Sequence, residues 1–154
     1  MIDLGSLVTP DRVLLDLKAT SKRQVLRSLA QAAARVTGVD AEVILEALLQ
    51  RERLGTTGLG EGIAIPHARV PGLASFTGFF ARLAKPVDFE AVDGAPVDLV
   101  FLLLAPEGTG TDHLKALARI ARLLREEEFR NALRTCPDRA KVHAILAGRP
   151  EAAR

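Results

Sequence analysis

The sequence is poor in two chemically distinctive kinds of residue. It contains one cysteine, no tryptophan and no tyrosine, and its only large aromatic side chains are six phenylalanines. Cys136 alone cannot form an internal disulfide, which fits a reducing compartment. Without tryptophan or tyrosine among its basic residues, the chain offers no platform for stacking bases. We therefore expect a fold that needs no disulfide and no nucleic acid as a partner.

Charge of one sign and long apolar runs are also lacking. The 21 Lys and Arg residues nearly balance the 19 Asp and Glu residues, for a formal net charge of +2. The longest apolar run, residues 99–105, is too short to cross a bilayer. Residues 1–5 lack the basic and apolar segments of a secretory signal. These absences predict a cytoplasmic protein that does not insert into membranes.

Metal and nucleotide sites have no support in the pattern of residues. The three histidines and the single cysteine lack zinc-ligand spacing, and the acidic residues are not grouped to hold magnesium. The glycine-rich segment 55–62 lacks the Gly-Lys-Ser/Thr ending of a Walker loop, and it precedes an apolar strand where that loop precedes a helix. We expect chemistry that uses no metal and no other cofactor.

The sequence alternates apolar strands with amphipathic helices, and its 154 residues are most economically one domain, residues 1–154. Strands are expected at residues 12–17, 63–65, 76–83 and 97–104, and helices at residues 20–37, 40–53, from 111 or 112 onward, and 138–147. Lys85-Pro86 should end the third strand. Helices at both ends with strands between them predict an α/β fold, a mixed β-sheet covered by helices on its faces in a three-layer sandwich.

Residues 54–67, Leu-Gly-Thr-Thr-Gly-Leu-Gly-Glu-Gly-Ile-Ala-Ile-Pro-His, are the most informative stretch. Pro66 has no N–H for a sheet ladder, so the strand should end there and present His67 at a mouth. The four glycines let backbone N–H groups approach an anion such as phosphate. A neutral imidazole is nucleophilic near pH 7 and forms a phosphoramidate that is easily passed on. His67 is the predicted phosphoryl carrier; the alternative is a surface histidine at a strand end.

Further residues could assist His67. Arg51 ends a helix shortly before the glycine segment, and its planar guanidinium matches phosphoryl oxygens, although it could be a solvated cation that complements the helix dipole. His113 opens a helix whose N-terminus attracts anions, or else belongs to a cap network. Arg53 and Arg69 are weaker candidates and are expected to be solvated.

The glycine segment itself contributes four candidates. Thr56, Thr57 and Gly58 could donate hydrogen bonds to a phosphoryl group or serve a local turn. Glu61 could polarise His67 through a hydrogen bond or remain a solvated carboxylate. No metal ligand is assigned among them.

Residues 60–67, Gly-x-Gly-x-Ala-Ile-Pro-His, together with Arg51-Glu52-Arg53 upstream, resemble the active-site signature of the fructose/mannitol-type (type 2) enzyme IIA domains of the bacterial phosphoenolpyruvate-dependent phosphotransferase system. The likeness covers nearly the whole chain, including residues 9–16, 92–100 and 111–114. Within that group the chain is most similar to the stand-alone nitrogen-regulatory members.

The resemblance implies a phosphocarrier. His67 would accept a phosphoryl group at Nε2 from an HPr-like donor protein, Arg51 would match the family's phosphate-binding arginine, and His113 its second active-site histidine. A nitrogen-type member would regulate partner proteins by its phosphorylation state, whereas a sugar-specific member would pass the group to a cysteine of a IIB domain for fructose or mannitol. Glu61 is more typical of mannitol-type members, so the subtype stays open.

Two further expectations concern contacts with other proteins. We expect a largely apolar rim around His67, formed by Ile65, Val70 and Leu73, to dock the donor. A different class of function is a protein-binding regulatory module of the same fold that carries no phosphate. The oligomeric state cannot be inferred from the sequence.

Overall fold

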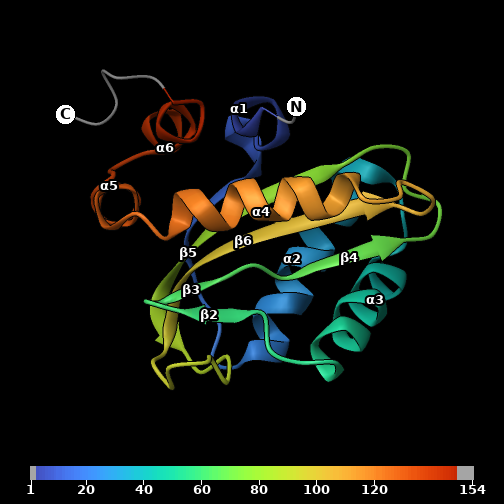
Figure 1. Ribbon diagram of the computed structural model, residues 1–154, viewed down its shortest axis with the longest axis horizontal. Coiled ribbons are helices and arrows are strands. Elements are labelled where there is room, and N and C mark those ends of the chain that lie inside the picture. Colours follow the sequence, from blue (N-terminus) through green and yellow to red (C-terminus); the bar gives the residue numbers. More distant parts are fainter. Residues whose placement is uncertain (1–2, 149–154) are drawn as a thin grey trace.

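The computed structural model describes residues 3–148, which form a six-stranded mixed sheet with helices on both faces (Figure 1). The strands are β1 (Val13–Leu17), β2 (Gly58–Gly60), β3 (Ile63–Ala64), β4 (His67–Val70), β5 (Thr77–Val87) and β6 (Val97–Pro106). The helices are α1 (Leu4–Leu7), α2 (Lys22–Thr37), α3 (Ala41–Arg53), α4 (Asp112–Leu124), α5 (Glu127–Thr135) and α6 (Arg139–Leu146), with a 3-10 turn at Pro10–Arg12. The expected three-layer α/β fold is confirmed.

The two central strands divide the core into two clusters. Strand order in the sheet is β1-β5-β6-β3-β2, and β5 and β6 run antiparallel. Successive side chains point to opposite faces, so Phe79 and Leu102 pack toward α2 and α3, while Phe80 and Phe101 pack toward α1, α4, α5 and α6. Full burial of each such side chain contributes about 1.5–3 kcal/mol. Because both faces are covered, the near-continuous apolar run of β6 is explained.

Helix boundaries follow the local signals in the sequence. Ser21 Oγ accepts a hydrogen bond from the Gln24 N–H at 3.2 Å and caps α2, and Gly38 ends it with a φ of +75°. Asp40 caps α3 by accepting from the Glu42 N–H at 2.8 Å. The expected helices at 20–37 and 40–53 are therefore confirmed to within two residues at each end.

Several elements differ from expectation. The strand expected at residues 76–83 is β5, and it continues through Pro86 to Val87. Its register with β6 shifts between Arg82 and Val87, and Pro86 is exposed in this irregular stretch. The missing N–H of Pro86 therefore costs no hydrogen bond of the ladder. Helix α1 has only four residues. Helix α5 was not expected, although Phe129, Ala132 and Leu133 recur at helical spacing and pack against the core. Helix α1 is too short to show such periodicity.

Residues 58–60 of the glycine segment form strand β2 of a hairpin, where the sequence predicts no strand. Strand β2 pairs antiparallel with β3, and the two residues between them, Glu61 and Gly62, have φ values of +58° and +78°. Positive φ at both central positions is the signature of a type I′ turn, which matches the twist of the flanking strands. The glycines of this segment thus serve the backbone geometry of the hairpin.

Strands β3 and β4 lie end to end along the same side of β6. Ile63 is in register with Leu99 and His67 with Leu103, both parallel, and residues 65–66 form the break between them. Pro66 interrupts the ladder as predicted, but His67 begins a further strand. Within residues 3–148 no strand pairs with the other side of β4. His67 therefore lies at an open sheet edge.

No helix in the described part of the chain combines the length and the apolar content needed to cross a membrane.

Candidate functional site

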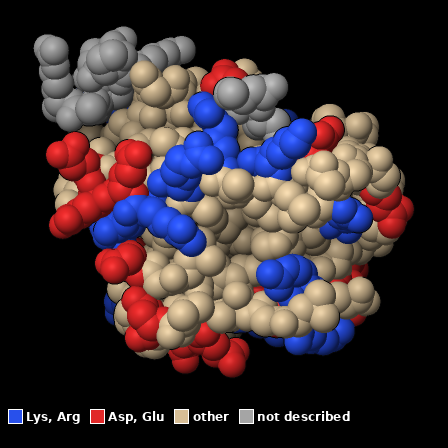
Figure 2. Space-filling view, viewed as in Figure 1, with Lys and Arg blue, Asp and Glu red and all other residues tan. Residues whose placement is uncertain are grey.

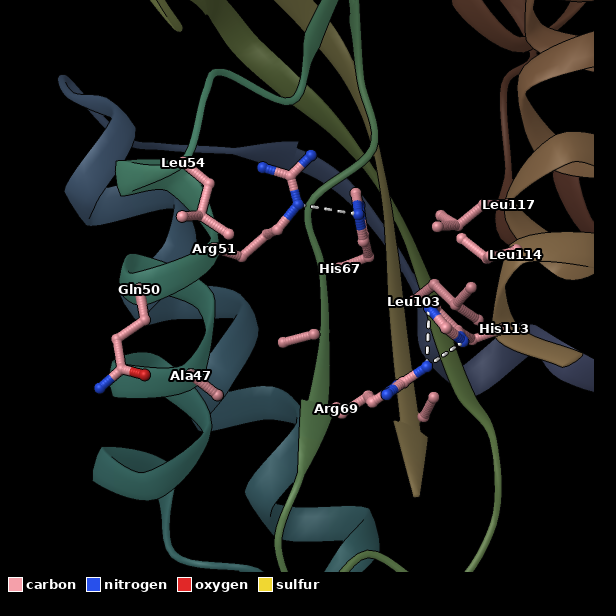
Figure 3. Close-up of a pocket in the computed structure, with 12 residues that line it drawn as sticks. Ala47, Gln50, Arg51, Leu54, His67, Arg69, Leu103, His113, Leu114 and Leu117 are labelled. Atoms are coloured by element: carbon pink, nitrogen blue, oxygen red, sulfur yellow. Dashed lines mark hydrogen bonds between the residues drawn. The ribbon is translucent and has the colours of Figure 1, made fainter. Parts of the chain in front are cut away.

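A pocket lies at the open edge of β4, where three elements approach one another (Figure 3). The last turn of α3 contributes Arg51, β4 contributes His67 and Arg69, and the first turn of α4 contributes His113. Residues that are far apart in the sequence thus face one cavity. The structure brings together the three predicted catalytic residues, Arg51, His67 and His113.

The hydrogen bonds of His67 define its tautomer. Nδ1 lies 2.8 Å from the carbonyl oxygen of Ile65, which can only accept, so Nδ1 carries the proton. Nε2 lies 3.1 Å from Nε of Arg51, which always carries a hydrogen and donates it. The neutral ring consequently presents its lone pair at Nε2, toward a guanidinium.

The surroundings of His67 keep its ring neutral. Burial lowers the pKa of His67 below its usual value, because a buried imidazolium loses hydration. The hydrogen bond to Ile65 opposes this effect, and the positive charge of Arg51 lowers the pKa further. The unprotonated ring is the form that can act as a nucleophile.

Arg51 is held by the segment that follows α3. Its Nη1 donates to the carbonyl oxygen of Gly55 at 2.9 Å, in addition to the bond from Nε to His67. Nη2 has no hydrogen-bond partner among residues 3–148. Arg51 therefore has a fixed position and a donor left for a ligand.

Glu52, which sequence reasoning overlooked, organises the same segment. Its side chain is only 7% exposed and lies 2.7 Å from Nζ of Lys22. Its carboxylate also accepts from the N–H and the hydroxyl group of Thr57. A buried carboxylate is stable only when paired and hydrogen-bonded, and here the pairing fixes residues 54–57 beside Arg51. Glu52 follows Arg51 in the Arg51-Glu52-Arg53 motif, and this position is the signal in the sequence that could have identified it.

His113 and Arg69 form the opposite wall of the pocket. Nδ1 of His113 lies 3.0 Å from the carbonyl oxygen of Gly110, and Nη2 of Arg69 donates to the same oxygen at 2.8 Å. Nη2 of Arg69 lies 3.1 and 3.4 Å from the two ring nitrogens of His113. Arg69 is exposed, as expected, and its side chain also lines the pocket beside His113.

The four candidates from the glycine segment do not line this pocket. The hydroxyl group of Thr56 donates to the Phe89 carbonyl and accepts from the Gly58 N–H at 3.0 Å, and that of Thr57 donates to Glu52. Glu61 is exposed, with its carboxylate 3.7 Å from Arg130. Their side chains and the Gly58 N–H already have partners, so a phosphate-binding role for these residues remains an untested prediction.

A family comparison agrees with this geometry. The family model described as "Phosphoenolpyruvate-dependent sugar phosphotransferase system, EIIA 2" matches residues 6–148. The chain belongs to this EIIA 2 family. The resemblance inferred from the sequence is confirmed, and the chain takes part in phosphotransferase-system function at that level.

Relatives of this EIIA 2 chain include regulatory and sugar-specific proteins. It is 54% identical over 150 residues to the nitrogen regulatory protein of Bradyrhizobium diazoefficiens, covering 97% of this chain and 98% of that protein. It is 40% identical over 124 residues to the fructose-specific EIIA component of Haloferax volcanii, covering 80% and 79%. The crystal structure of nitrogen regulatory protein IIA-Ntr from Neisseria meningitidis superposes with a TM-score of 0.88 at 37% identity, covering 92% of this chain and 97% of that chain.

The apolar rim of the EIIA 2 pocket differs from the expected one. Ile65, Val70 and Leu73 are buried, Ile65 in one core cluster and the other two in the other cluster. Two other leucines line the pocket and are exposed, Leu54 by 84% and Leu114 by 54%. They lie at the end of α3 and in the first turn of α4, on either side of His67 (Figure 3).

No group of three His, Cys, Asp or Glu side chains within residues 3–148 is arranged to hold a metal ion.

Proposed function

We propose that this chain is a cytoplasmic phosphocarrier: His67 accepts a phosphoryl group from a phosphohistidine on an HPr-like donor protein, and its phosphorylation state regulates partner proteins. The observation that carries the proposal is the tautomer of His67. Its Nδ1 proton is held by Ile65, and the Nε2 lone pair faces Arg51 in an accessible pocket. An unprotonated nitrogen beside a cation is suited to attack a dianionic phosphoryl group.

The transfer step is an in-line displacement between two imidazoles. The hydrogen bond from Nε of Arg51 to Nε2 of His67 breaks and frees the Nε2 lone pair. A bond then forms between Nε2 and phosphorus, while the bond from phosphorus to the donor's ring nitrogen breaks and its electron pair returns to the donor ring. Nη2 of Arg51 would donate to an equatorial oxygen. His113 faces the same pocket from the opposite wall. Its Nδ1 proton is held by the Gly110 carbonyl oxygen, so the ring would donate to another phosphoryl oxygen only with a second proton on Nε2.

Leu54 and Leu114 are the proposed contacts for the donor. They are exposed apolar side chains on both sides of His67, and apolar contacts at the centre of an interface exclude water from the reacting groups. Docking on both leucines would place a donor imidazole over the pocket between them.

The regulatory form of the proposal is supported by the relative from Bradyrhizobium diazoefficiens, which matches this chain over nearly its full length and is a nitrogen regulatory protein. The fructose-specific relative from Haloferax volcanii supports the alternative, a sugar-specific IIA that passes phosphate to a IIB cysteine. Incubating the phosphorylated chain with a fructose-type IIB domain separates the two. Rapid transfer to the cysteine would favour the sugar-specific alternative.

The central test is intact-mass spectrometry at alkaline pH, since phosphohistidine is acid-labile. Wild type and His67→Ala are incubated with phosphoenolpyruvate, enzyme I and the HPr-like donor. His143→Gln is the matched control, because His143 lies outside the pocket and bonds to the carbonyl oxygen of Gly5 at 2.7 Å. Wild type and His143→Gln should gain one phosphate and His67→Ala none. Arg51→Ala should gain it about 100-fold more slowly, the cost of losing one aimed donor.

If wild type gains no phosphate from a donor that phosphorylates another IIA protein, the carrier function is excluded. The remaining function would then be the protein-binding module without phosphate.

A further inference from the structure

The first turn of α4, which carries His113, has few restraints of its own. The segment 107–111 that leads into it contains Gly108 and Gly110, both with positive φ. Thr111, at the N-cap position, makes no side-chain hydrogen bond to the helix. The N–H groups of Asp112 and Leu114 bond to the carbonyl oxygens of Thr109 and Thr111, so the restraints of this turn are short-range backbone bonds. None of these bonds reaches β4, and the contact that ties His113 to that strand is a separate one.

That contact comes from Arg69 on β4. Its Nη2 donates to the carbonyl oxygen of Gly110 at 2.8 Å, and His113 donates to the same oxygen from Nδ1 at 3.0 Å. Within residues 3–148, Arg69 is the side chain from outside the segment that hydrogen-bonds to it. The close approach of Arg69 to both ring nitrogens places its guanidinium against the ring of His113 (Figure 3).

The same strand carries the reacting group. Residues two apart in a strand point to the same face, so His67 and Arg69 extend from one face of β4, whereas Val70 is buried on the other. β4 is in turn paired with β6 in register from His67 to Val70. A rigid strand therefore bears the nucleophile at one position and the contact to His113 two positions later.

We propose that Arg69 is the positioning residue for His113: by bridging β4 and the start of α4 through Gly110, it holds the ring of His113 at a set place and tautomer relative to His67. The inference rests on the proposed phosphocarrier function. Arg69 acts through His113, and the two histidines keep their spacing because one strand carries both the nucleophile and the bridge.

Phosphoryl-transfer time courses test this on Arg69→Ala, His113→Ala and the double variant, with Arg53→Ala as the control. Arg53 is an exposed arginine that does not line the pocket and pairs with Glu46. Arg69→Ala should slow transfer by about 10-fold to 100-fold, the scale of misplacing a catalytic group by about 1 Å. In the His113→Ala background it should slow transfer no further, because the residue it positions is absent. Arg53→Ala should transfer at the wild-type rate.

Long-range ¹H–¹⁵N spectra of the histidine rings provide a readout that needs no donor protein. Wild type should show His113 protonated at Nδ1 in a single tautomer, and Arg69→Ala a mixture, with the His67 and His143 signals unchanged. A wild-type transfer rate in Arg69→Ala would overturn the proposal. So would an Arg69→Ala substitution that slows transfer equally in the wild-type and His113→Ala backgrounds, or a His113 spectrum that Arg69→Ala leaves unchanged. Absence of phosphate on wild type would instead overturn the carrier function, and the spectra would still decide whether Arg69 orients His113.

Discussion

At the scale of single residues, His67 becomes a neutral nucleophile through contacts of two kinds. The bond from Nδ1 to the Ile65 carbonyl is local and depends on the chain direction after Pro66. The bond from Arg51 crosses from another element. The bond to Ile65 fixes Nε2 as the unprotonated nitrogen, and the bond from Arg51 places a cation beside it.

The lowered pKa of His67 predicts a pH dependence of stability. Below about pH 6.5, the usual histidine pKa, His67 is protonated in the unfolded chain. In the folded chain it stays unprotonated until the pH reaches its lowered pKa. Because the unfolded state then binds more protons, the free energy of unfolding falls as the pH falls through the window between the usual and the lowered pKa. Above that window the contribution of His67 is constant. His67→Gln should remove this part of the slope.

Urea titrations of wild type and His67→Gln between about pH 5 and pH 7.5 measure the difference in slope. The carboxyl groups of Asp3, Asp11 and Asp93 have pKa values lowered mainly by hydrogen bonds, so their effects lie below this range. Identical slopes for the two proteins would show that burial of His67 does not resist protonation.

At the scale of elements, the β2–β3 hairpin is joined to α5 across the sheet edge. Arg134 of α5 binds both carboxylate oxygens of Asp98, at 2.8 and 2.9 Å, and its Nη2 donates to the Glu61 carbonyl at 2.7 Å. Arg82 donates from β5 to three carbonyl groups at the end of α5, those of Leu133, Arg134 and Cys136. Arginine bridges therefore attach α5 in addition to the packing of Leu133 and Phe129 against the core.

Gly62 is the residue of this hairpin that should tolerate substitution least. An alanine there would adopt a φ near +78°, and its Cβ would stand inside contact distance of Arg134 Nη2 and 2.8 Å from Asp98 Oδ1. Gly72 has a similar φ of +82° but open space around it. Gly72→Ala should cost about 1–2 kcal/mol, the left-handed strain alone. Gly62→Ala should cost more, because it also displaces the Arg134–Asp98 pair.

The free energy of unfolding in urea compares the two variants directly. Equal losses would mean that Arg134 moves aside without cost and that the bridge to α5 contributes little.

At the scale of the whole molecule, the surface between α4 and α3 combines cations with exposed apolar groups. Lys and Arg side chains border a largely uncharged area between these helices (Figure 2). Leu54 and Leu114 are its exposed apolar contacts.

Leu54→Ala and Leu114→Ala should each raise the KM for the phosphorylated donor by roughly 5-fold to 30-fold, since truncating a contact side chain in an interface costs about 1–2 kcal/mol. Both side chains are exposed, so the midpoint of unfolding should change little. Val92→Ala is the control, because Val92 is 79% exposed and outside the pocket. Steady-state phosphorylation at varied donor concentrations measures the effect, and a KM equal to that of wild type in both leucine variants would place the donor elsewhere.

Sequence reasoning succeeded where neighbouring residues decide the outcome. Ser21 and Gly38 delimit α2, the apolar run at 97–104 lies within the central strand, and Pro66 breaks the ladder before His67. It failed at the Glu61–Gly62 turn, where a local signal for a hairpin was not recognised. It also failed where a remote partner decides, as at Pro86, which continues a strand because its pairing with β6 is irregular.

By itself, the sequence determined the α/β class, the main helices and strands, the family resemblance and the choice of Arg51, His67 and His113 as candidates, because caps, periodicity and short motifs act over a few residues. Only the tertiary structure decided that Arg69 contacts His113, 44 positions away, that Glu52 is buried beside Lys22, and that Leu54 and Leu114, instead of Ile65, Val70 and Leu73, form the exposed rim. Those outcomes depend on how packed layers place separate elements against the open edge of β4, and chain proximity carries no information about that packing.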